Sequence, residues 1–274
     1  MSVRAAGSLR RLLGHRLVPP GQVSVVRMYG PIGGGARAAD WIELIRRLRV
    51  SWRVPAVVLD IDSPGGSATA SDDMYLAIRR LAERKPVVAA IRGVGASGGY
   101  LVAMGAHRVV ANPNAVVGSI GVISVGPRVR VLLERLGVRV SETKAGRLKG
   151  VGAPWRDETP EEQGKEQALV DALYDAFVER VATGRRLEPD RVRELATGEV
   201  WLGRQALELG LVDEIGDLER AIEIAAAMAG VPARGAPVRF RRSIIDRVID
   251  RVTGASAAVL SDTLAARLDD RYRF

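Results

Sequence analysis

Ser97 is the residue of this sequence best placed to act as a nucleophile. It lies in the run GVGASGGY (residues 93–100), which follows an apolar stretch and has small residues on both sides of the serine. If a helix starts there, the hydroxyl would lie beside free N–H groups at the positive end of the helix dipole, which suits nucleophilic catalysis. The same pattern is also typical of a turn that only allows a strand and a helix to pack closely.

A second small-residue segment, Ser63-Pro64-Gly65-Gly66, follows the apolar run at residues 56–61. The carboxyl ends of parallel strands are the usual place for a site in an open α/β sheet. Glycine N–H groups at such a turn can form an oxyanion hole. A plain connection between a strand and a helix would have the same composition, so this segment alone does not decide between the two.

A serine nucleophile needs a proton acceptor, and this chain offers few. It has two histidines: His15 lies near the N-terminus, and His107 lies at an expected helix-to-strand junction, where we interpret it as structural. Nearly all of its 41 basic residues are arginine, yet Lys144 and Lys149 fall in one short segment. Because arginine stays protonated whereas burial lowers the pKa of lysine, these two lysines are candidate bases.

The elements that must position these residues alternate between apolar strands and amphipathic helices, which predicts an α/β fold with a parallel sheet and right-handed crossovers. The segment Thr159-Pro160-Glu161-Glu162 predicts the start of a long helix, with Thr159 as N-cap and Glu162 completing a capping box. The other expected elements are strands at 23–26, 56–61, 86–91 and 108–111, and helices at 40–48, 71–83, 100–104, 191–195, 204–209 and 218–228.

Composition divides the chain into three parts. The sequence predicts a basic amphipathic arm at residues 1–21, one catalytic domain at residues 22–230 and a helical tail at residues 231–274. We interpret residues 230–237, which are rich in glycine and proline, as a hinge. The tail carries an apolar stripe that we expect to pack against the body or a second subunit; it comprises Ile244, Ile245, Val248, Ile249 and Val252.

Bulk composition excludes several classes of protein. The chain has no cysteine, so disulfides and cysteine-based zinc sites are excluded, and we expect neither a cofactor nor a metal. The net charge is +9, but arginines are mixed with acids along the chain, so we expect a solvated basic surface and no nucleic-acid partner. No segment has the ~20 apolar residues of a membrane span. We therefore expect a cytoplasmic protein, with peripheral membrane contact through residues 1–20 as the less favoured alternative.

Four segments, taken in order, resemble the signal peptide peptidase A family. They are DSPGG (residues 62–66), ASGGY (96–100), GSIGV (118–122) and GRLK (146–149), and the resemblance covers roughly residues 23–230. It implies a crotonase-like fold, shared with Clp protease, with a repeated β-β-α core and additional C-terminal helices. It also implies homo-oligomers that enclose their active sites.

The resemblance implies roles for five residues. Ser97 matches the nucleophile of the family, and Lys149, rather than Lys144, matches its general base. Ser119 matches a second serine that orients the lysine, and the N–H groups of Gly66 and Gly98 match the oxyanion hole. The implied activity is that of a serine endopeptidase with a Ser-Lys dyad, acting on peptides such as signal-peptide remnants or other apolar peptides in an enclosed chamber.

Two other classes of function remain as alternatives. A crotonase-fold enzyme acting on acyl-CoA thioesters would use backbone N–H pairs and carboxylate bases, and it would leave the pair of Ser97 and Lys149 without a role. A non-catalytic scaffold of the same fold is the other alternative, and the presence of Ser97, Ser119 and Lys149 together argues against it.

Overall fold

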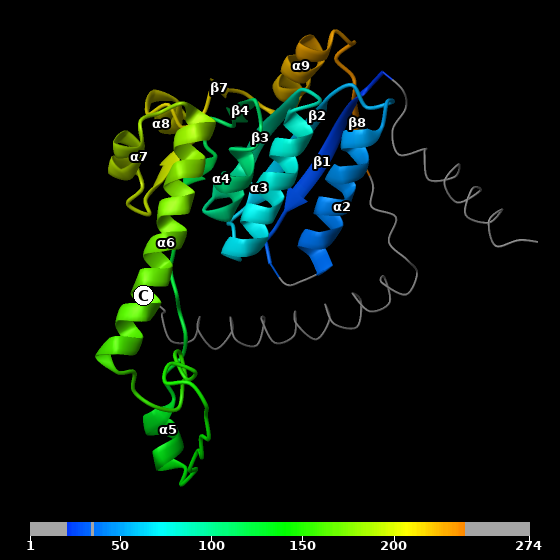
Figure 1. Cartoon of the computed structure of the whole chain (residues 1–274). Coiled ribbons are helices and arrows are strands. Elements are labelled where there is room, and N and C mark those ends of the chain that lie inside the picture. The colour runs from blue at the N-terminus through cyan, green and yellow to red at the C-terminus, as the bar shows by residue number, and fades with distance from the viewer. Residues whose placement is uncertain (1–20, 34–35, 239–274) are drawn as a thin grey trace, which may run out of the picture. The chain divides into compact units, whose positions relative to one another are not determined.

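The computed structural model describes residues 21–33 and 36–238 (Figure 1). Residues 1–20 of the expected N-terminal arm, which was predicted to span residues 1–21, and the apolar stripe of the tail lie outside the described residues. No helix in the described ranges is long and apolar enough to cross a membrane.

One sheet forms the centre of the described chain, with its strands in the order β6-β5-β3-β2-β1-β8. β4 pairs with β3, and β7 pairs with β4. Neighbouring strands are parallel except for β5 and β6, which are antiparallel. The bounds are β1 (Val23–Tyr29), β2 (Val57–Ser63), β3 (Val87–Ala96), β4 (Arg108–Ala111), β5 (Val116–Gly118), β6 (Val200–Leu202), β7 (Glu214–Ile215) and β8 (Gly235–Pro237).

Helices pack on this sheet and on one another. The apolar side of α9 packs on residues of β1, β2 and β3, with Ala221 and Ala225 against Val23, Val58 and Val88. The central strands are buried along almost their whole length, as expected for parallel strands that are covered on both faces. The bounds are α2 (Ala36–Val50), α3 (Ala68–Ala82), α4 (Gly98–Ala103), α5 (Arg130–Arg135), α6 (Pro160–Arg185), α7 (Pro189–Leu195), α8 (Gly203–Glu208) and α9 (Leu218–Ala229).

The expected hinge at residues 230–237 contains a strand, so that interpretation was wrong. β8 pairs in parallel with β1, and the N–H of Val238 donates to the carbonyl of Val25 at 2.9 Å. A Cβ on Gly235 would lie 2.5 Å from Ile222, so glycine is needed there for close packing rather than for bending. Pro237 is tolerated because β8 is an edge strand. The unit that holds the sheet therefore runs to Val238, beyond the expected boundary at residue 230.

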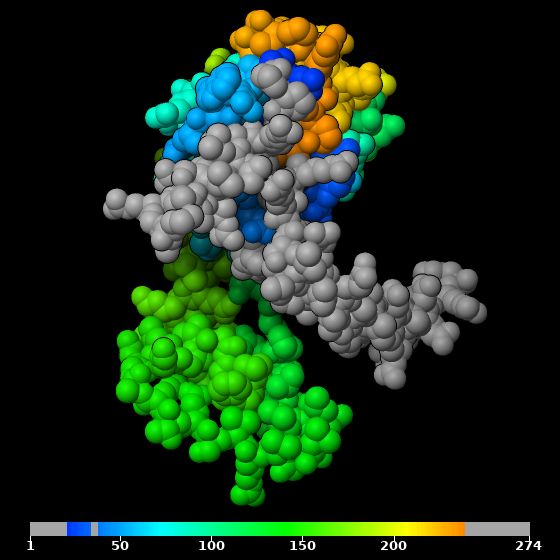
Figure 2. Space-filling view, turned by 90° about the vertical axis from the view of Figure 1, so that its right-hand side faces the viewer, coloured from blue at the N-terminus to red at the C-terminus, as the bar shows by residue number. Residues whose placement is uncertain are grey.

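Residues 124–158, here called the extension, have little regular structure apart from the short helix α5, none of whose residues is buried. The extension lies at the N-terminal end of α6, away from the sheet (Figures 1 and 2). It is tied there by Glu162, whose carboxylate accepts hydrogen bonds from both terminal nitrogens of Arg156 at 2.6 and 2.8 Å. Arg156 also donates to the carbonyl of Gly150 at 2.7 Å.

The predicted capping box of α6 is present and uses the same carboxylate. Thr159 Oγ1 accepts the N–H of Glu162 at 3.3 Å, and Glu162 accepts the N–H of Thr159 at 3.0 Å. The hydrogen bonds from Arg156, followed by that from Thr159, lower the pKa of Glu162 from its usual 4.5 to about 2, although burial acts in the opposite direction. One carboxylate thus both caps the helix and holds the extension.

We predict that Glu162→Gln loosens the extension at neutral pH. The folded-state pKa is lowered, so ionised Glu162 stabilises the fold above pH 4.5, and that contribution is lost as the pH falls towards about 2. Amide hydrogen exchange of residues 142–157 should be faster in the variant near neutral pH. Wild-type rates, corrected for intrinsic exchange, should approach those of the variant on acidification.

The matched control is Glu179→Gln, an exposed residue of the same helix that makes no hydrogen bond or ion pair through its side chain within the described ranges. Equal exchange rates for residues 142–157 in both variants would show that Glu162 does not anchor the extension.

Candidate active site

Ser97 occupies a sharp turn between the end of β3 and the start of α4. Its backbone has φ 50° and ψ −124°, a conformation that costs energy for a residue with a Cβ and is held only when its surroundings demand it. Its N–H donates to the carbonyl of Gly118 at 2.8 Å, while its side chain makes no capping bond to α4. The turn therefore presents a hydroxyl that is not used to hold the helix.

Ser97 lines a cleft together with Gly66, Gly98 and Ser119, so the structure brings four of the five predicted site residues together. Ser119 follows β5 and also has a positive φ of 50°, with its N–H bound to the carbonyl of Glu199 at 2.6 Å. The rest of the lining comes from the turn after β2, from α3, α4 and α6, and from the segments after Ser119 and after α7. Its apolar members include Leu101, Val122, Ile123, Leu173 and Phe177.

The glycines around Ser97 allow two turns to approach each other more closely than side chains would permit. A Cβ on Gly65 would lie 2.5 Å from the nitrogen of Gly98, and one on Gly66, where φ is 150°, would lie 1.8 Å from the carbonyl oxygen of Ile32. The N–H of Gly98 belongs to the first turn of α4, where no carbonyl of the helix can accept it. The turn after β2 and the start of α4 therefore meet at the same cleft.

Lys149 is exposed and does not line this cleft. Its neighbour Arg147 pairs with Glu161 in the first turn of α6, whereas the cleft is lined by the stretch of α6 that begins at Leu173. At 1.5 Å per helical residue, Glu161 and Leu173 are about 18 Å apart along the axis. Lys144, the other candidate, pairs with Glu142 at 3.1 Å. One chain, as described, does not bring either lysine to Ser97.

The cleft wall also holds charged residues that the sequence analysis did not single out. Arg180 of α6 donates to Asp72 of α3 at 3.2 Å and lies 5.0 Å from the centre of the Tyr75 ring. Asp72 and Asp73 follow the glycine turn closely and could have been noticed from that spacing. Arg180 has no local sequence signal, because it reaches the cleft only through the packing of α6.

His107, interpreted as structural, does not line the cleft. Its Nδ1 accepts the N–H of Val87 at 3.1 Å, which fixes the ring at the start of β3. The geometry therefore agrees with the structural interpretation.

We predict that Gly98→Ala destabilises the fold by about 1–3 kcal/mol, the usual cost of forcing extra volume into a packed site. The added Cβ would lie 2.1 Å from Oγ of the buried Ser71. Denaturant unfolding measures the effect, and adding Ser71→Ala should restore part of the loss. Gly121→Ala is the control, since its Cβ would meet only Gly198 at 3.6 Å. Equal stability of the two alanine variants would contradict the packing argument.

Solved structures with this fold include peptidases. A mutant of the 1510-N membrane-bound stomatin-specific protease superposes with a TM-score of 0.52 at 15% identity, covering 81% of this chain and all of that one. A mutant of ClpP1 from Listeria monocytogenes gives 0.51 at 16% identity, covering 78% of this chain and 98% of its own. These likenesses confirm the predicted Clp protease-like α/β fold.

Sequence comparison finds proteins that are more similar in sequence to this chain than these two structures are. A candidate protease of Synechocystis sp. is 39% identical over 77% of this chain and 75% of its own length. The chloroplastic serine protease SPPA of Arabidopsis thaliana is 38% identical over 76% of this chain, but the match spans only 32% of that protein. Protease 4 of Salmonella typhi is 34% identical over 87% of this chain and 38% of its own length.

A family model agrees with these relatives. The model of peptidase family S49 matches residues 79–232, which include Ser97, Ser119 and Lys149. The match covers more than half of the chain. With this match and these relatives, the chain belongs to peptidase family S49, the family of signal peptide peptidase A.

Proposed function

We propose that this peptidase is a serine endopeptidase in which Ser97 is the nucleophile and Lys149 the general base. The observation that carries the proposal is the turn at Ser97, which has a strained backbone, a hydroxyl free of capping bonds and a position in a cleft at the start of α4. Such a turn offers the hydroxyl to a bound carbonyl group.

The reaction would proceed by acyl transfer. Ser97 Oγ attacks the peptide carbonyl carbon while its proton passes to neutral Lys149 Nζ. The N–H groups of Gly66 and Gly98 would donate to the resulting oxyanion. The C–N bond then breaks, the lysine returns the proton to the leaving amine, and water hydrolyses the acyl-enzyme with the same lysine as base. Ser119, on the same cleft, would orient the amine through its hydroxyl.

The lining of the cleft supports apolar peptides as substrates. Leu101, Val122, Ile123, Leu173 and Phe177 give it an apolar wall, and Ile123 is 85% exposed in the single chain. Burial of one such side chain against a substrate contributes about 1.5–3 kcal/mol. Signal-peptide remnants have the apolar character that this wall would select.

We further propose that Lys149 reaches the cleft of a neighbouring copy in a homo-oligomer. The anchoring of its segment to the first turn of α6 keeps it from the cleft of its own chain. The extension also exposes apolar side chains whose contact with water is unfavourable, and a neighbouring copy would cover them. They are Val125, Val131, Leu132, Leu136, Val138 and Val140, each between 46% and 85% exposed.

This arrangement would also provide the pKa that catalysis needs. Lysine is a poor base while it is solvated and protonated, and burial lowers its pKa by removing water from the ammonium form. Entry into an apolar cleft would supply that burial. A chamber enclosed by several copies would keep folded proteins away from the serine.

The first test is Ser97→Ala. The variant should lose hydrolysis of apolar peptides and labelling by a fluorophosphonate probe, because both reactions require the serine hydroxyl. Light scattering should give the same assembly mass as the wild type, since the hydroxyl makes no capping bond in the described structure. Unchanged turnover in this variant would remove Ser97 from the mechanism.

The second test determines which of the two lysines, Lys144 or Lys149, is the general base. Lys149→Ala should lower the rate by about 10²–10⁴-fold, as expected for loss of a general base. Lys149→Arg should be similarly inactive because arginine cannot be deprotonated. Lys144→Ala, the matched control, should lose far less.

Co-expression of Ser97→Ala with Lys149→Ala then tests the neighbour arrangement. Mixed assemblies would contain intact sites built from one serine and one lysine of different copies, so activity should return although each variant alone is inactive. Co-assembly without recovered activity would place the base on the same chain as the serine. Full activity of Lys149→Ala alone would mean that another residue is the base.

A further inference from the structure

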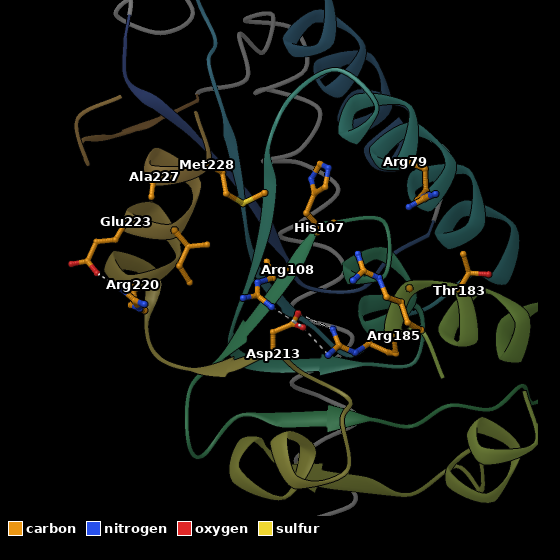
Figure 3. Close-up of a pocket in the computed structure, with 14 residues that line it drawn as sticks. Arg79, His107, Arg108, Thr183, Arg185, Asp213, Arg220, Glu223, Ala227 and Met228 are labelled. Atoms are coloured by element: carbon orange, nitrogen blue, oxygen red, sulfur yellow. Dashed lines mark hydrogen bonds and ion pairs between the residues drawn. The ribbon is translucent and has the colours of Figure 1, made fainter. Parts of the chain in front are cut away.

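A second pocket lies outside the peptidase cleft and shares no lining residue with it. Its walls come from α3, the junction of α4 and β4, the C-terminal end of α6, and α9 (Figure 3). The lining contains five arginines but only two carboxylates. The arginines are Arg79, Arg108, Arg185, Arg186 and Arg220, and the carboxylates are Asp213 and Glu223.

Both carboxylates already form ion pairs with arginines of the pocket. Asp213 accepts two bonds from Arg185, at 2.8 and 3.0 Å, and one from the N–H of Val109 at 2.7 Å. Arg108 approaches the same carboxylate only to 3.7 Å and stays half-exposed. Arg220 pairs with Glu223 at 2.9 Å and also with Glu214, outside the lining, at 2.5 Å. The excess of cationic donors over acids therefore comes from the other arginines of the lining.

Two arginines of the lining have no acidic partner within the described residues. Arg79 and Arg186 are exposed, and neither side chain makes a hydrogen bond or ion pair there. Arginines near the C-terminal end of a helix commonly offset the helix dipole, which accounts for Arg185 and Arg186 at the end of α6 and for Arg79 in the last turn of α3. It accounts neither for Arg108 of β4 nor for the meeting of both helix ends and this strand at one pocket. Like charges gathered from separate elements favour an anionic ligand between them.

We propose that this pocket binds a small phosphate-bearing molecule. Each guanidinium presents a planar set of N–H donors that matches phosphate oxygens in pairs. His107 adds a donor, because its Nδ1 accepts the N–H of Val87 and the neutral ring then carries its hydrogen on Nε2. Ala106, Ile224 and Met228 provide an apolar wall for the organic part of such a molecule.

The test is calorimetric titration of the full chain with sodium pyrophosphate at constant ionic strength. We expect saturable binding that chloride does not reproduce. Arg79→Gln and Arg186→Gln should each weaken it by roughly tenfold, the effect of losing one charge-assisted contact. The matched control is Arg80→Gln, which removes the same charge from the next residue of α3, an exposed residue outside the pocket. Its affinity should equal that of the wild type.

Sedimentation with phosphatidic acid vesicles, compared with phosphatidylcholine vesicles, distinguishes a lipid headgroup from a free phosphate. The proposal is supported if binding depends on Arg79 and Arg186 but not on Arg80. Binding of pyrophosphate would identify a free phosphate as the ligand, and binding of phosphatidic acid alone would identify a lipid headgroup. No saturable binding to either probe would overturn it. An equal loss in Arg80→Gln would also overturn it, because binding would then follow overall surface charge.

Discussion

The close approach of two backbone turns is the constraint on which the site depends. The turn after β2 contacts the start of α4 so closely that Gly65 and Gly98 leave no room for a methyl group between them. This contact fixes where α4 begins and holds Ser97 in its unfavourable conformation. Strand pairing in the core supplies the rigidity, because β2 and β3 are buried and pair in parallel. Ser97 is therefore held by backbone packing rather than by side-chain hydrogen bonds.

Features with a local signal could be predicted from the sequence. The capping box of α6 is encoded within four residues, and the apolar runs of the central strands reflect burial on both faces. Ser97, Ser119, Gly66 and Gly98 were grouped through the resemblance to signal peptide peptidase A. The structure brings them to one cleft because the turns that hold them follow the carboxyl ends of β2, β3 and β5, which lie side by side.

Features that depend on distant packing could not be predicted. The glycine and proline of residues 230–237 looked like a hinge because composition does not reveal that Gly235 packs against Ile222. The position of Lys149 depends on how the extension is anchored to α6, which follows from Arg156 and Glu162 rather than from the lysine motif. The basic pocket was equally hidden, since Arg79, Arg108 and Arg185 come from three separate elements and look like scattered surface charge in the sequence.

The anchoring of the extension has a consequence for how such a peptidase would be switched on. If the lysine of one copy completes the site of the next, a newly made chain is harmless without any propeptide or inhibitor. Such a chain is inactive because its own lysine lies away from its serine, and it becomes active when it associates with another copy. Specific activity would then fall on dilution more steeply than the number of chains does, and the cell could set proteolytic output through the abundance of this one protein. Glu162, which makes no contact with Ser97, would then contribute to this control by anchoring the segment of Lys149 to α6.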